Sequence, residues 1–270
     1  MSTSVSAKSP AGEFERRSKR AEQLSADAPV TREPLVFAAA LCREQSTVAL
    51  SIEEAHLSRP LTGRLVEDIG RVLPLLSPVV RLAAEHGPPE LAEHARNRVG
   101  EDPSVASSRL SSLWSGEASA REDYLSRAML RPYAEVLRAY GVSPDRLHRQ
   151  GYCPFCGGAP AVSARKEMPD SNAAARILQC GLCGCDWNAV RAICPACAEG
   201  DPQKLPIFTS DAYPSMRIEA CETCRRYVKS VDLTADARMI PEIDELLALS
   251  MDLWAIEEGF TRIEPGLAGL

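Results

Sequence analysis

The sequence lacks the features that mark several large classes of protein. It has no basic excess, because 31 Lys and Arg residues are outnumbered by 37 Asp and Glu residues, which gives a net charge of −6. A general nucleic-acid-binding protein usually has the opposite balance, so no nucleic-acid partner is expected. No apolar run approaches the roughly 18 residues of a membrane helix, so no membrane insertion is expected either. The longest run, residues 72–84, is broken by Pro74, Ser77, Pro78 and Arg81.

A secretory leader and the common catalytic motifs are also missing. Residues 1–24 contain no apolar segment, and none follows the Arg16-Arg17 pair, which predicts a cytoplasmic protein. There is no phosphate-binding loop, no dinucleotide fingerprint and no Ser-His-Asp arrangement, so we predict no catalytic residues and no organic cofactor site. The four histidines all precede the cysteine-rich region and make no convincing metal ligands: His56, His86, His94 and His148.

Helical periodicity dominates the first 150 of the 270 residues. Residues 1–30 are polar and are expected to form a flexible N-terminal segment, part of which could be helical, and residues 31–150 a helical domain. Within that domain the apolar spacing predicts helices over residues 34–57, 61–87, 89–100 and 123–141. Residues 61–87 form either one interrupted helix or two, and Pro132 should kink or divide the last helix.

The rest of the chain changes character. Residues 151–231 hold nine of the ten cysteines and are expected to form a tandem metal-ribbon module, divided into 151–191 and 192–231. Residues 232–270 contain a predicted helix from Pro241 to Gly259. Its apolar face should pack on the helical domain and consists of Ile243, Leu246, Leu247, Leu253 and Trp254. The predicted fold class is therefore α+β, with a helical N-terminal domain, tandem rubredoxin- or zinc-ribbon-like four-cysteine modules and a closing C-terminal helix.

Acidic residues are concentrated near the C-terminus. Between positions 232 and 264, nine acidic residues stand against Arg238 and Arg262. This pattern is typical of a solvated helix face, and the alternative is an acidic surface that binds a basic partner segment.

The cysteines form a duplicated pattern. Adding 41 to the position of each cysteine in the first set gives a cysteine of the second set, and Pro154, Arg176 and Ile177 have counterparts at the same offset. The repeated unit is C-x2-C-x23-C-x2-C, which is a tandem duplication. The two sets are Cys153, Cys156, Cys180 and Cys183, and Cys194, Cys197, Cys221 and Cys224.

The spacing predicts two four-cysteine metal sites. Each CxxC turn can present two sulfurs to one tetrahedral ion, as in zinc ribbons and rubredoxin-type iron sites, and clustered cysteines in a reducing cytosol favour metal over disulfides. We pair the turns in chain order, and a crossed pairing is the main alternative. A redox dithiol at Cys153 and Cys156 would need a βαβ context that the sequence does not supply. Four sulfurs suit iron and zinc alike, and the ion could also serve only to stabilise a small loop-rich domain.

Other positions near the pattern bear on how the sites behave. Gly157 and Gly184 follow their turns in the first unit, whereas Ala198 and Arg225 stand there in the second, so the two sites are expected to differ. Cys185 is interpreted as a bystander, with a spare ligand or a reactive thiol as the alternatives. Cys42 lies in an apolar helical pattern and should be a small buried core residue.

These residues together resemble a known family. The segments "YCPFCGGAP", "ILQCGLCGCDWNAVRAICPAC", "IEACETCRRYVKSVDL" and "PEIDELLALSMDLWAIEEGF" are similar to the formate dehydrogenase accessory protein family, FdhE. The resemblance implies a cytoplasmic, non-enzymatic protein that assists assembly of a respiratory formate dehydrogenase and contacts its catalytic subunit before export. It also implies rubredoxin-like iron on the eight paired cysteines, with zinc as the alternative metal, and a homo-oligomer is compatible with the sequence.

Two other functions are weighed against this one. A zinc-ribbon nucleic-acid or transcription module should show a basic stripe with exposed aromatic residues. Residues 151–230 contain nine basic and eight acidic residues, so the sequence supplies no such stripe. An electron carrier of the rubredoxin kind, or a dithiol reductase, is the third hypothesis.

Overall fold

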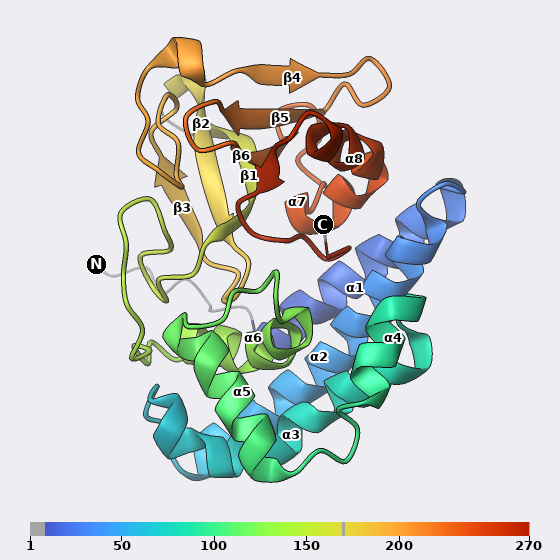
Figure 1. The fold of residues 1–270 in the computed structure, drawn as a ribbon, viewed down its shortest axis with the longest axis vertical. Coiled ribbons are helices and arrows are strands. Elements are labelled where there is room, and N and C mark those ends of the chain that lie inside the picture. Colours follow the sequence, from blue (N-terminus) through green and yellow to red (C-terminus); the bar gives the residue numbers. More distant parts are fainter. Residues whose placement is uncertain (1–8, 169–170, 270) are drawn as a thin grey trace.

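A computed structural model describes residues 9–168 and 171–269 (Figure 1). The first half is a layer of helices and the second half a twisted sheet with its own short helices, so the predicted α+β class, with two cysteine modules and a closing helix, is confirmed. The helices of the first layer are α1 (Pro10–Asp27), α2 (Arg32–Ser58), α3 (Leu65–His86), α4 (Pro89–Arg96), α5 (Pro103–Ser115) and α6 (Tyr124–Ala139). How the chain divides into separately folding domains stays a prediction.

The helix α1 corrects the expectation of a flexible N-terminal segment. It runs antiparallel beside α2, and Phe14 and Arg17 are buried (Figure 1). The polar composition of residues 1–30 suggests an exposed segment. However, Arg17 can be buried because glutamates from distant elements neutralise its charge. Residues 1–8 lie outside the described part of the chain.

Three internal prolines do not interrupt their helices. Pro74 and Pro78 lie within one continuous α3, and Pro132 lies within one continuous α6. Burial of the flanking apolar residues, such as Leu76 and Tyr133, holds these helices together despite the lost backbone hydrogen bonds. The helix α5 has no counterpart among the predicted helices.

The helix α2 is long and apolar enough to cross a membrane by length and composition, which the sequence reading did not anticipate. Its residues Leu35, Leu41 and Ile52 are fully buried against neighbouring helices, as in the core helix of a globular domain.

Six of the seven strands of the sheet form two copies of one three-stranded unit. The strands are β1 (Pro160–Met168), β2 (Ser171–Cys180), β3 (Asp186–Ala189), β4 (Ile207–Thr209), β5 (Met216–Cys221), β6 (Arg226–Asp232) and β7 (Thr261–Arg262). Their order is β3-β2-β1-β6-β5-β4, with β7 also paired to β6. Arg176 pairs with Ala189 in the first unit, and Arg217 pairs with Ser230 in the second, each shifted by the same 41 positions. The parallel β1–β6 pairing joins the two units into one sheet.

The C-terminal segment differs from the single helix that we predict. It forms α7 (Pro241–Asp244), a 3-10 turn over Glu245–Ala248 and α8 (Leu249–Glu257). Ile243 joins the core of the helical layer, whereas Met251 and Ala255 of α8 pack on the sheet with Ile218. The segment therefore bridges the two halves of the molecule.

The acidic residues of this segment are mostly not on a solvated face. Asp244 and Asp252 are fully buried, and Glu242 and Glu245 are almost so, each in an ion pair with a basic residue. These four residues therefore form neither the solvated helix face nor the acidic docking surface that the sequence suggests. Their carboxylates are buried and neutralised, so they present no charge to a partner.

Candidate metal centres

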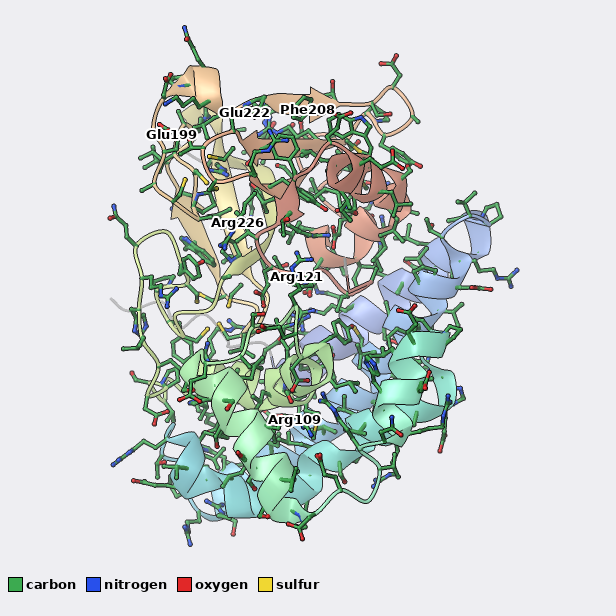
Figure 2. All side chains as sticks on the ribbon, viewed as in Figure 1. Arg109, Arg121, Glu199, Phe208, Glu222 and Arg226 are labelled. Atoms are coloured by element: carbon green, nitrogen blue, oxygen red, sulfur yellow. The ribbon has the colours of Figure 1, made fainter. Side chains whose placement is uncertain are left out.

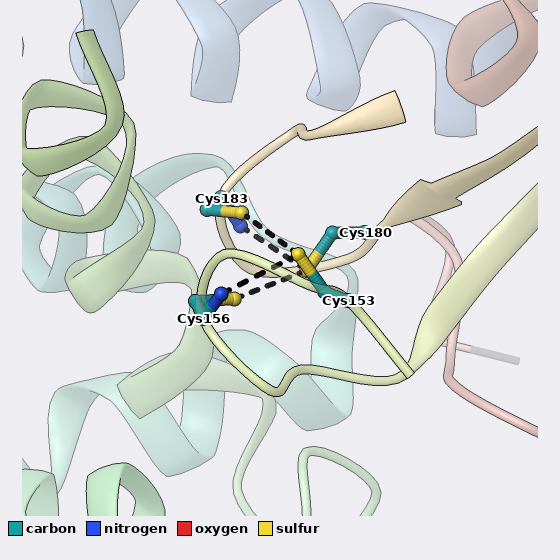
Figure 3. Close-up of side chains that lie close together, drawn as sticks. All are labelled: Cys153, Cys156, Cys180 and Cys183. Carbon is teal, nitrogen blue, oxygen red and sulfur yellow. Dashed lines mark hydrogen bonds between the residues drawn. The ribbon is translucent and has the colours of Figure 1, made fainter. Parts of the chain in front are cut away.

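Two groups of four cysteine sulfurs assemble in chain order. The first cluster is Cys153, Cys156, Cys180 and Cys183, and the second cluster is Cys194, Cys197, Cys221 and Cys224. Figure 3 shows the four thiols of the first cluster converging from two turns of the chain. Within each cluster all four sulfurs lie within 4.8 Å of one another, so the crossed pairing is not formed.

The sheet explains why each cluster closes. In the first unit, one CxxC turn precedes β1 and the other follows the end of β2, so the β1–β2 hairpin brings them together. In the second unit, β4 and β5 do the same for the turns at Cys194 and Cys221. Hydrogen bonds from the Cys153 amide to the Gly158 carbonyl, and from the Cys194 amide to the Glu199 carbonyl, close the two equivalent turns at 2.9 Å.

The sulfur separations fit a tetrahedral metal ion. Across the first cluster, the Sγ atoms of Cys153 and Cys183 are 3.6 Å apart, and those of Cys156 and Cys180 are 3.4 Å apart. The corresponding separations in the second cluster are 3.8 and 3.7 Å. Four sulfurs at about 2.3 Å from one ion would be about 3.8 Å apart, whereas a disulfide needs about 2.05 Å. Both clusters could therefore hold a metal ion, and all ten cysteines are free thiols.

Backbone amides in the first cluster point at sulfur. The Cys156 and Cys183 amides donate to the Sγ of Cys153 and Cys180, both at 3.5 Å, and the amides of Gly158 and Leu182 donate at 3.4 Å. Amide donors of this kind stabilise thiolate, which is the form that binds metal. This donor set suits zinc and ferrous or ferric iron equally.

The residue after each CxxC turn adopts a left-handed conformation. The φ angles are +67° at Gly157, +62° at Gly184, +62° at Ala198 and +55° at Arg225. A Cβ atom at Gly157 would collide with the carbonyl oxygen of Leu147, which lies in the loop between α6 and β1. Ala198 and Arg225 are both exposed, so the second unit accommodates their side chains in the same conformation.

The two clusters differ in their access to water. The first cluster is fully buried and is part of the core that includes the helical layer. Arg138 of α6 donates to the Cys183 carbonyl, and Arg146 donates to the Cys156 carbonyl, both at 2.8 Å. In the second cluster, Cys197 is exposed and Cys224 is half-buried. The expected difference between the sites therefore has a clear structural basis in burial.

The remaining candidate residues lie outside the two groups. Cys185 is half-buried beside the first cluster, and its interaction with the Cys153 thiol, together with burial, raises its pKa to about 11. Cys42 is fully buried among apolar side chains, as predicted, and burial raises its pKa to about 12. His148 is exposed, and its Nε2 lies 3.2 Å from the Phe155 carbonyl oxygen.

Sequence reasoning missed a buried ring of charges beside the first cluster. Arg17 of α1 lies 2.9 Å from Glu135 of α6 and 2.6 Å from Glu242 of α7, and Arg131 of α6 contacts both glutamates. We call these four residues the charge ring. No local sequence pattern predicts the charge ring, because its arginine–glutamate pairs lie as much as 225 positions apart in the chain.

The duplicated sheet units and paired four-cysteine clusters define a protein with tandem ribbon-type metal-binding modules attached to a helical layer. Two FdhE family models match this chain: residues 152–191 match the FdhE central domain, and residues 193–267 match the FdhE C-terminal domain. The earlier resemblance is thus confirmed.

Individual relatives agree with this assignment. The chain is 26% identical to a protein FdhE homolog of Aquifex aeolicus, with 84% of this chain and 82% of the relative covered. It is 25% identical to a protein FdhE homolog of Haemophilus influenzae, with 94% and 87% covered. The crystal structure of the FdhE protein from Pseudomonas aeruginosa superposes with a TM-score of 0.69, at 24% identity and with 94% of each chain covered. This last likeness shows a shared fold.

Proposed function

We propose that this protein is a cytoplasmic accessory protein for the assembly or maturation of a respiratory formate dehydrogenase. It binds the catalytic subunit of that enzyme before export, and it does not itself turn over formate. Its eight paired cysteines hold two metal ions, with iron favoured and zinc as the alternative. The observation that carries the proposal is the placement of both four-cysteine clusters within the two FdhE domains.

The geometry supports a binding role better than a catalytic one. A metal ion in the first cluster would cross-link the two turns at the open end of the β1–β2 hairpin, where Arg138 of α6 also contacts the Cys183 carbonyl. Arg138 of α6 donates to the Cys183 carbonyl in one turn, and Arg146 of the following loop donates to the Cys156 carbonyl in the other. The ribbons thereby form a rigid face on which an immature subunit can dock, and rigidity of this kind reduces the entropic cost of binding.

The experiment that tests the proposal is an anaerobic affinity pull-down of the tagged protein from its host. We expect the formate dehydrogenase catalytic subunit to be recovered and identified by mass spectrometry. The Cys180→Ser/Cys183→Ser variant should lose it. Because that variant removes buried ligands and could unfold, Cys197→Ser/Cys224→Ser at the more exposed cluster serves as the second variant. Deletion of the gene with full retention of formate dehydrogenase activity would overturn the proposal.

One observation favours a second candidate function, that of a rubredoxin-like electron carrier. Electron transfer to a partner requires a ligand close to the surface, and the exposed Cys197 provides one for the second cluster. Reversible bleaching of an iron-loaded, coloured protein by a reductase would support this candidate. A colourless zinc form as the only form isolated from cells would exclude it.

A further inference from the structure

The charges of this acidic protein are unevenly distributed. Two adjoining cavities, of about 310 and 470 Å³, are lined by ten arginines and two glutamates, without lysine or aspartate. The first is bordered by Arg165, Arg176, Arg191, Arg217 and Arg226, and the second by Arg121, Arg127, Arg146, Arg149, Arg226 and Arg262. We call the two cavities together the arginine cleft.

The cleft runs past both metal-binding units. Its first cavity includes Cys194 and Cys221 of the second cluster, and its second cavity includes Gly157 beside the first cluster. Arg226 borders both cavities. In Figure 2, Arg226 at the start of β6 lies above Arg121, near the middle of the view where the sheet meets the helical layer.

Some of these arginines form the walls of the cleft. Arg176 is buried, and its guanidinium donates to Glu219 at 2.8 Å and to the carbonyls of Val190 and Ile193. Arg262 is likewise buried against Glu245. Both side chains are held by carboxylates inside the fold, so they contribute positive potential and shape to the cleft rather than exposed donors.

Four other arginines at the cleft are exposed and have no carboxylate partner among the described residues. The side chains of Arg149 and Arg226 make no hydrogen bond or ion pair with the described part of the chain. Arg121 and Arg191 each donate only to a main-chain carbonyl. Their planar forks are free to bind carboxylate or phosphate oxygens in a bidentate manner.

We propose that the arginine cleft binds an extended acidic segment of a polypeptide. The free guanidiniums are distributed over two cavities rather than converging on one point, which suits a chain of carboxylates better than a single small anion. A nucleic acid would need aromatic surfaces for base stacking. At the second cavity, Trp114 is buried with the Arg146 guanidinium over its ring, and Tyr152 is half-buried. The first cavity has no aromatic residue in its lining, so the cleft lacks a row of exposed aromatic rings. The identity of the peptide's source, though not the binding itself, rests on the proposed function: the segment then belongs to the client, the catalytic subunit of formate dehydrogenase.

The first experiment measures binding of a fluorescein-labelled peptide of about ten glutamates to the metal-loaded, full-length protein by fluorescence anisotropy. We expect saturable binding that weakens as salt rises from about 50 to 200 mM, because the contacts are charged. The Arg149→Gln/Arg226→Gln variant should bind about tenfold more weakly. A native protein that shows no saturable binding overturns the proposal, whatever the result of the client pull-down.

The matched control is Arg32→Gln/Arg59→Gln. These two arginines are also exposed and lack side-chain partners in the described residues, but they lie outside the cleft. Affinity should stay within about twofold of the native value, since long-range effects of net charge are screened. An equal loss in both double variants would show a general charge effect and contradict the cleft.

Two further readouts exclude other roles. Metal content should be unchanged in Arg149→Gln/Arg226→Gln, and loss of metal there would show that the arginines only balance the charge of the clusters. A single-stranded DNA oligonucleotide of equal charge should compete less well than unlabelled peptide. Stronger competition by DNA would overturn the assignment to a polypeptide.

Discussion

The four left-handed residues that follow the CxxC turns show how one backbone conformation meets two surroundings. A residue with a Cβ atom is strained at positive φ, by about 1–2 kcal/mol. Ala198 and Arg225 bear that strain in the second unit, where space is open. At Gly184 a Cβ would lie 3.0 Å from Arg17 and Glu135 of the charge ring. Glycine in the first unit is therefore favoured by close packing as well as by conformation.

At Gly157 we predict that substitution by alanine destabilises the protein by at least about 2 kcal/mol, from backbone strain together with the clash against the Leu147 carbonyl. For a chain of this size the melting temperature should fall by at least about 4 °C, measured at a fixed zinc concentration. The equivalent change in the second unit, Ala198→Gly, removes strain and should leave the melting temperature equal or slightly higher. A Gly157→Ala variant as stable as the native protein would contradict the role given to this contact.

At the scale of elements, the two sheet units share their strand register but differ in how far the helical layer buries them. The first cluster shares a core with the helical layer, whereas Cys197 of the second cluster is exposed. In Figure 1, β4 and β5 of the second unit lie at the end of the molecule opposite α3 and α5. Release of a metal ion requires water or a chelator to reach the sulfurs, and local opening is easier where fewer contacts must break. The two sites should therefore exchange metal at different rates.

We predict biphasic release of metal to a coloured chelator, with one ion leaving at least about tenfold faster than the other. The fast phase belongs to the second cluster, so Cys197→Ser should remove it and leave the slow phase unchanged. Absorbance of the chelator complex gives both rates. A single rate for both ions, or a fast phase that persists in Cys197→Ser, would show that burial does not control release.

The same elements show what can be predicted from sequence. The clusters follow from local spacing, because each CxxC turn and the hairpin between turns are encoded within about 40 residues. The assignment of the segment from Pro241 to Gly259 to a single helix is wrong, because its break depends on burial of Asp244 and Asp252 against Arg20 and Lys229. The order of α1 likewise depends on glutamates far away in sequence. Local pattern predicts elements, but the partners of buried charges are set by the assembled fold.

At the scale of the whole molecule, net charge conceals how charges are arranged. A balance of −6 and an even mixture in residues 151–230 predict no basic surface, yet ten arginines gather around one cleft. Many acidic residues are withdrawn into the interior, where they pair with other basic side chains. A count along the sequence cannot separate buried carboxylates from exposed ones, and so it underestimates the positive potential of a local surface.

The charge ring joins α1, α6 and α7, and its pH dependence tests whether it holds the two halves of the molecule together. Burial alone would raise the pKa of Glu242, but Arg131 and Arg17 lower it from 4.5 to about 2. A carboxyl group with a depressed pKa in the folded state stabilises the protein above pH 4.5 and loses that contribution as the pH falls toward 2.

The native protein should thus exceed Glu242→Gln in stability by about 3 kcal/mol at pH 7. The difference should shrink between pH 4.5 and 2, as measured by denaturant unfolding at each pH. Glu257→Gln, at an exposed position, should show almost no difference at any pH. A gap for Glu242→Gln that persists unchanged at pH 2 would mean that packing, rather than charge pairing, accounts for the role of Glu242.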